Sequence, residues 1–120
     1  MAKRILIFDD DKDILEVTAA ILSKYNFEVK TINYLENGFL TNVRNFKPDV
    51  ILMDLRIPEI GGMAATLQLK KTSDTKDIPV ILFTAQNNGK ETLEKSTGAD
   101  DVVFKPFTIS NLMQKIEAVG

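Results

Sequence analysis

The stretch VILMD, residues 50–54, is a run of four apolar residues that ends in a carboxylate. Two similar runs occur elsewhere in the chain, ILIF at 5–8 and VILF at 80–83. All three runs are continuous rather than alternating, which is typical of parallel strands that helices cover on both faces. They therefore predict the central strands of a parallel sheet.

Weaker signals lie between and beside these runs. Residues 27–32 and 102–104 are shorter or interrupted apolar segments, which predict two flanking strands. Apolar residues at helical spacing predict three helices, with the core-facing positions Ile14, Thr18, Ile21, Leu22 and Tyr25; Leu35, Phe39, Val43 and Phe46; and Ile109, Leu112, Met113 and Ile116. Two weaker helices are expected at 62–71, facing the core with Met63 and Leu67, and at 90–97, around Leu93.

Five strands thus alternate with five helices along 120 residues. Such a chain predicts an α/β fold with a doubly wound parallel sheet, because right-handed crossovers place helices on both faces. The length fits one domain, residues 1–120.

The composition restricts the chemistry. The chain has no cysteine and no histidine, which excludes disulfides, thiolate sites and imidazole ligands. A net charge of -2 with both signs interspersed gives no basic surface for nucleic acid. No apolar run reaches the roughly 18 residues of a membrane span. We expect no direct nucleic-acid or membrane binding, and a cytoplasmic location.

Polar side chains follow four of the five predicted strands directly. They are Asp9 with Asp10, Asp54, Thr84 and Lys105. Taken singly, each has an ordinary interpretation as a helix cap, a turn residue or a solvated side chain. Ligands of open parallel sheets, however, bind beyond the carboxyl ends of the strands. Their joint placement therefore predicts a shared site.

The acidic members of this site should repel one another. Asp54 is expected beside Asp9 and Asp10, because the first and third strands are neighbours where the strand order reverses. Two carboxylates about 4 Å apart repel by roughly 4 kcal/mol at an effective dielectric near 20, so three of them need a cation. Oxygen donors without soft ligands favour Mg²⁺, with Lys105 as a second positive charge.

Four segments together resemble the receiver domains of bacterial two-component response regulators. These segments are the Asp9-Asp10 pair, the stretch from Asp54 to Pro58 with Gly62, the Thr84-Ala85 pair, and the stretch from Gly98 to Asp101 that leads to Lys105-Pro106-Phe107. The resemblance runs from Arg4 to about Ala118. It implies a flavodoxin-like three-layer sandwich with strand order 2-1-3-4-5.

The resemblance also implies a function. Asp54 would accept a phosphoryl group from a sensor histidine kinase or a histidine phosphotransfer protein, while Thr84 and Lys105 would bind phosphoryl oxygens. The chain would then be a signalling switch and not an enzyme with its own substrate. Nothing in the sequence resembles an ATP site, because a Gly-rich P-loop is missing.

The family's metal site carries over to four positions. Asp10, Asp54 and the backbone carbonyl of Arg56 would hold Mg²⁺, and Asp9 would bind mainly through water. The peptide bond between Lys105 and Pro106 resembles one that is cis in the family, where it turns the lysine inward.

Switching is expected to alter the face made by residues 90–97, 102–104 and the last helix, with a monomer or a phosphorylation-linked dimer as the result. Val102 stands where the family commonly has an aromatic residue, so the usual coupling to Thr84 is not expected. Phe104 should point away from Val103 and does not take over that role. Arg56 and Gln86 are expected to influence the lifetime of the phosphoryl group.

Two alternatives compete with this interpretation. Asp9-Asp10-Asp11 satisfies the D-x-D signature of haloacid-dehalogenase-type phosphohydrolases, but Asp13 stands where that motif continues with Thr or Val. The stronger alternative is a binding module with the receiver fold that works without phosphorylation. The presence of all five key side chains argues against it.

Overall fold

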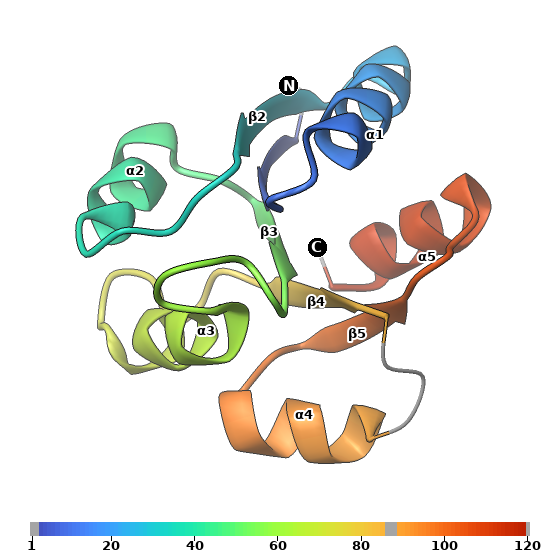
Figure 1. The fold of residues 1–120 in the computed structure, drawn as a ribbon. Coiled ribbons are helices and arrows are strands. Elements are labelled where there is room, and N and C mark those ends of the chain that lie inside the picture. Colours follow the sequence, from blue (N-terminus) through green and yellow to red (C-terminus); the bar gives the residue numbers. More distant parts are fainter. Residues whose placement is uncertain (1–2, 86–88, 120) are drawn as a thin grey trace.

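The computed structural model describes residues 3–85 and 89–119, and in them five strands alternate with five helices (Figure 1). The strands are β1 (Arg4–Phe8), β2 (Glu28–Ile32), β3 (Val50–Asp54), β4 (Val80–Thr84) and β5 (Asp101–Phe104). The helices are α1 (Lys12–Lys24), α2 (Phe39–Phe46), α3 (Gly62–Lys71), α4 (Lys90–Thr97) and α5 (Ile109–Val119). The predicted alternation is confirmed.

All five strands are parallel, in the order β2-β1-β3-β4-β5. The predicted doubly wound sheet and its strand order are therefore confirmed. The order reverses between β1 and β3, where Phe8 pairs with Met53. Asp9 and Asp54 follow these two residues, so the register brings them to the same edge of the sheet.

Helices cover both faces of the sheet, and each face has its own core. Helices α2, α3 and α4 lie on one side, and α1 and α5 lie on the other (Figure 1). Along β3, Ile51 and Met53 point to the first side, while Val50 and Leu52 point to the second. Every residue of β3 and β4 is buried, which explains why their apolar runs are continuous.

Helix α3 faces the sheet with different residues from those predicted. Met63 is 41% exposed, and the buried positions are Gly62, Ala65, Thr66 and Leu69. These four follow helical spacing, but two of them are not apolar. The prediction was wrong because it used the apolar residues alone to find the buried face.

Smaller corrections concern α1 and α2. Tyr25 was expected to face the core, but it is the C-cap of α1 and is 57% exposed. Leu15 is buried instead, a position that the apolar periodicity did not indicate. Leu35 is fully buried as expected, although it precedes α2 and lies in a loop. Within the described ranges, no helix is long and apolar enough to cross a membrane.

Candidate functional site

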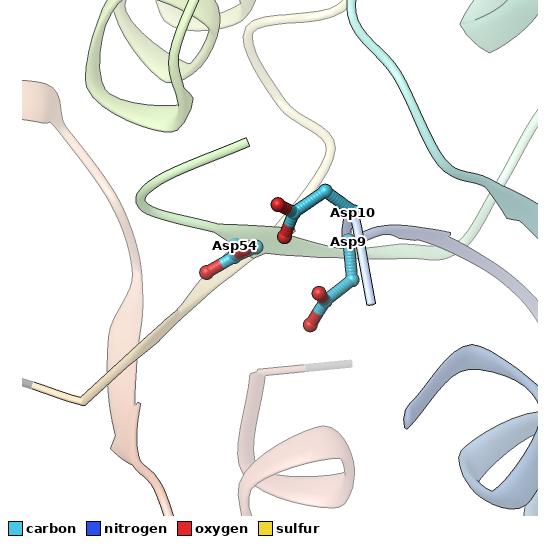
Figure 2. A group of neighbouring side chains, drawn as sticks. All are labelled: Asp9, Asp10 and Asp54. Atoms are coloured by element: carbon cyan, nitrogen blue, oxygen red, sulfur yellow. The ribbon is translucent and has the colours of Figure 1, made fainter. Parts of the chain in front are cut away.

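Three carboxylates gather where β1 and β3 end (Figure 2). Asp9, Asp10 and Asp54 each offer one oxygen, and these oxygens all lie within 4.8 Å of one another. Asp9 is fully buried and Asp54 is 6% exposed, whereas Asp10 is exposed. The structure thus brings together the three acidic residues that the sequence analysis assigned to the site.

The turn after β1 fixes Asp9 and begins α1. One oxygen of Asp9, Oδ1, accepts a hydrogen bond of 2.9 Å from the amide of Asp11. The side chain of Asp11 in turn accepts from the amides of Asp13 and Ile14, at 3.0 and 3.3 Å, and caps the helix. The capping role considered for an aspartate in this turn therefore belongs to Asp11, which leaves Asp9 and Asp10 for the site.

Lys105 directly follows the last residue of β5, and its side chain extends into the site. Its Nζ lies 2.9 Å from Oδ2 of Asp9 and 3.6 Å from Oδ1 of Asp54. The peptide bond between Lys105 and Pro106 is cis, as predicted. The backbone amide of Lys105 donates to the carbonyl of Thr84 at 2.7 Å. Asp9 is therefore the closer partner of the lysine, and Asp54 is the second.

Thr84 is the last residue of β4 and is 2% exposed. It pairs with Phe104 of β5, and the preceding residue, Phe83, pairs with Asp54 of β3. The register therefore places Thr84 on the strand next to Asp54, at the same edge of the sheet. This is the position that the sequence analysis predicted for it.

The loop between β3 and α3 starts at the site and is tightly closed. Oδ1 of Asp54 accepts from the amide of Arg56 at 3.4 Å, and the amide of Gly62 donates to the carbonyl of Leu55 at 3.0 Å. A Cβ on Gly62 would lie 2.2 Å from the carbonyl oxygen of Asp54. Only glycine lets α3 begin this close to the strand end.

The surroundings of Asp54 change its pKa. Burial, and after it the negative charge of Asp9, raise the pKa of Asp54 to about 6, although Lys105 and the amide of Arg56 act in the opposite direction. Burial alone would lower the pKa of Lys105, but the hydrogen bond with Asp9 and the charges of Asp54 and Asp9 raise it above its usual range. The site therefore has a deficit of positive charge that a cation would relieve.

An apolar groove of about 730 Å³ borders the site, and the sequence analysis did not predict it. Ala85 and Lys105 lie at its site end, and Ile14, Val17, Ile21 and Phe107 belong to its apolar lining. Val17 is 58% exposed. The spacing of residues 14, 17 and 21 on α1 is the signal that would have indicated the groove. Gln86, expected to affect the phosphoryl group, lies outside the described residues.

Comparison with known proteins identifies the family of this arrangement. The sequence model of the response regulator receiver domain matches residues 5–117. The chain belongs to this family. It is a receiver domain of the two-component response regulators, and the family's function is phosphorylation-based signalling.

Two curated relatives show different lengths. The receiver domain is 36% identical to the protein PilH of Pseudomonas aeruginosa over 117 residues, covering 97% of this chain and 96% of PilH. It is 34% identical to the phosphate regulon transcriptional regulatory protein PhoB of Escherichia coli over 121 residues, covering 99% of this chain. The match spans only 52% of PhoB, so the chain corresponds to about half of that regulator.

Solved structures agree with the fold. A response regulator from Chloroflexus aurantiacus superposes with a TM-score of 0.90 at 25% identity, covering 99% of this chain and 98% of the other. The receiver domain of the sensor histidine kinase PA1611 from Pseudomonas aeruginosa has a TM-score of 0.85 at 24% identity, covering 98% and 97%. That structure has a magnesium ion coordinated in its active-site cleft.

Proposed function

We propose that Asp54 accepts a phosphoryl group from the phosphohistidine of a sensor histidine kinase or a histidine phosphotransfer protein. The observation that carries this proposal is the position of the Asp54 carboxylate, which lies among Asp9, Asp10 and Lys105 with Lys105 Nζ at 3.6 Å. An acceptor of this kind needs positioning and neutralisation of charge more than it needs a base. The absence of histidine from the sequence suits that requirement.

In the proposed step, an oxygen of the ionised Asp54 carboxylate forms a bond to phosphorus. The bond between phosphorus and the donor's imidazole nitrogen breaks, and its electron pair leaves with that nitrogen. The product is an acyl phosphate on Asp54. Lys105 would bind one phosphoryl oxygen with its ammonium group, and Thr84 would donate a hydrogen bond to another.

The donor groups fit Mg²⁺, which prefers a few carboxylate and carbonyl oxygens together with water. The side chains of Asp10 and Asp54 and the carbonyl of Arg56 would hold the ion, and Asp9 would bind mainly through water. When bound, Mg²⁺ would neutralise negative charge on the phosphoryl oxygens. The magnesium in the cleft of the PA1611 receiver domain supports this assignment.

The apolar groove between α1 and the start of α5 is the surface that we assign to the phosphodonor. It is continuous with the site at Ala85 and Lys105, so it offers a contact surface to a protein that brings a phosphohistidine to Asp54. Val17, an exposed apolar side chain of the lining, would be covered by an apolar side chain of the donor. We assign this encounter, and the chain itself, to the cytoplasm.

The output surface is the face made by α4, β5 and α5. Val102 is 2% exposed and packs in the core that α4 covers, and Phe104 packs against the same core, on the side opposite Val103. Neither residue takes the role of the aromatic switch that is common at the Val102 position in the family. A shift of α4 itself would therefore carry the signal, leading to a changed monomer surface or a dimer.

A phosphorylation assay tests the proposal. The chain is incubated with Mg²⁺ and acetyl phosphate or a phosphohistidine donor, and its intact mass is measured. We expect the wild type to gain one phosphoryl group that is stable to acid and labile to base, and Asp54→Asn to gain none.

An unchanged wild-type mass at saturating donor would contradict phosphorylation and favour a binding module. Addition of one phosphoryl group to Asp54→Asn would place the acceptor elsewhere. Multiple turnover of small phosphate esters, which we expect to be absent, would indicate a hydrolase.

A further inference from the structure

Glu59 has a backbone conformation that its residue type rarely adopts. Its φ is +77°, in the left-handed region, where most side chains are strained. Among the described residues, two other non-glycine residues have a positive φ, Asn26 and Lys47, and both lie at helix ends, where this conformation is common. Glu59 instead lies within the loop that joins β3 to α3, five positions after Asp54.

A second loop pairs with the backbone of Glu59. Leu35, between β2 and α2, forms a parallel bridge with Glu59. The side chain of Leu35 is fully buried in the same core cluster as Ile57, whereas Glu59 is exposed. The bridge therefore ties the exposed part of the β3–α3 loop to a residue that the core fixes.

Residues 55–61 are also restrained by backbone hydrogen bonds and by burial of one side chain. The amide of Leu55 donates to the carbonyl of Phe83 at 2.9 Å, and the carbonyl of Leu55 accepts from Gly62 at 3.0 Å. Ile57 is anchored in the core at 1% exposure. Arg56 lies between these anchors, so closure of the loop, including the conformation of Glu59, restricts the backbone torsions that set the direction of the Arg56 carbonyl.

We propose that Glu59, through its left-handed backbone and its bridge to Leu35, is a positioning residue that aims the Arg56 carbonyl at the cation site. This inference rests on the proposed function, in which that carbonyl is a Mg²⁺ ligand. Groups that orient metal ligands without touching the metal typically change metal affinity by about 10- to 100-fold when they are removed. The strained backbone of Glu59 would then serve to place the Arg56 carbonyl, which is the metal ligand.

Two substitutions at Glu59 separate backbone conformation from charge. Glu59→Gly and Glu59→Val both remove the carboxylate, but glycine adopts a φ of +77° without strain and a β-branched residue does not. We expect Glu59→Val to weaken Mg²⁺ binding about tenfold. Glu59→Gly should stay within about twofold of the wild type. Mg²⁺ alone is titrated by calorimetry, and the Arg56 and Asp10 amide resonances are followed by NMR.

A buried pair of leucines gives the matched control. Leu35→Ala and Leu112→Ala each truncate a fully buried leucine, on opposite faces of the sheet. Both should lower the midpoint of thermal unfolding, but only Leu35→Ala should weaken Mg²⁺ binding. If either variant fails to fold, the Glu59 pair still decides, because its side chain is exposed.

Equal Mg²⁺ affinities in Glu59→Val and Glu59→Gly, whether strong or weak, would overturn the positioning role while leaving the proposed function intact. A wild type that does not bind Mg²⁺ at all would instead overturn the metal site of the proposed function, and the inference with it.

Discussion

Asp54 carries a charge that the metal-free protein tolerates poorly. The residue is 6% exposed, and burial and Asp9 both disfavour its ionised form. We expect Asp54→Asn to raise the free energy of unfolding by about 1–2 kcal/mol at pH 8 without metal, because the amide removes this charge. Urea unfolding in the presence of a chelator measures the difference.

Added Mg²⁺ should make the wild type more stable than Asp54→Asn. The ion stabilises the wild type by binding to the folded state, and it should bind much less to the Asn variant. The expected result is a rise in wild-type stability with Mg²⁺ concentration and a flat response of Asp54→Asn. A variant less stable than the wild type without metal would contradict the assigned charge repulsion.

Gly62 allows the start of α3 to approach the backbone of Asp54 and Leu55 closely. A Cβ there would lie 2.2 Å from the carbonyl oxygen of Asp54 and 2.8 Å from the Cα of Leu55, and both are backbone atoms that cannot move aside. We expect Gly62→Ala to destabilise the fold by about 2–4 kcal/mol. At Gly38 a Cβ meets nothing within 4 Å, so Gly38→Ala should cost about 1 kcal/mol or less. Similar losses of stability in the two variants would contradict the close approach.

At the scale of elements, Asp101 joins α4 and α5 across the edge strand β5. Its Oδ1 lies 3.1 Å from Nζ of Lys90, and its Oδ2 lies 3.2 Å from Nζ of Lys115. Helix α4 needs this contact, because it buries only Leu93 and Thr97 and begins with a lysine at its positive end. Asp101 therefore holds the first turn of α4 in the arrangement seen here.

The contribution of Asp101 should depend on pH. Burial opposes its ionised form, but the amide of Val102 and the two lysines outweigh burial and lower the pKa of Asp101. A lowered pKa gives stability that is present above the unfolded value of about 3.9 and is lost as the pH falls through the folded value. We expect Asp101→Asn to cost about 1 kcal/mol at pH 7 and almost nothing near pH 2. Urea unfolding of the wild type and of Asp101→Asn across this pH range tests the prediction. A loss of stability that is the same at every pH would exclude an ionic contribution of Asp101.

At the scale of the whole molecule, the groove beside the site separates protein donors from small ones. In the proposed function, acetyl phosphate needs only access to Asp54, whereas a kinase or phosphotransfer protein would also contact the groove. We expect Val17→Glu to slow transfer from a phosphohistidine protein by about tenfold, because it places a charge in an apolar contact. Its rate with acetyl phosphate should be unchanged.

Tyr25→Glu is the matched control, since Tyr25 is 57% exposed against 58% for Val17 and lies outside the groove lining. This variant should react normally with both donors. Equal slowing of Val17→Glu with acetyl phosphate and with the protein donor would indicate damage to the site and not to a docking surface.

The sequence by itself determined the sheet and the residues at its edge. Continuous apolar runs identified β1, β3 and β4, because strands buried on both faces cannot alternate with polar residues. The residue directly after each run was then placed by topology alone, since parallel strands all end at one edge. Asp9, Asp54 and Thr84 could be assigned to a common site for this reason.

Only the tertiary structure decided how the helices and loops meet that sheet. The buried face of α3 follows the close contact between Gly62 and Asp54, and its spacing is hidden because glycine and threonine carry no apolar signal. The left-handed Glu59 and its bridge to Leu35 join loops more than 20 residues apart in sequence. Contacts of this kind depend on how neighbouring elements pack, and no local pattern encodes them.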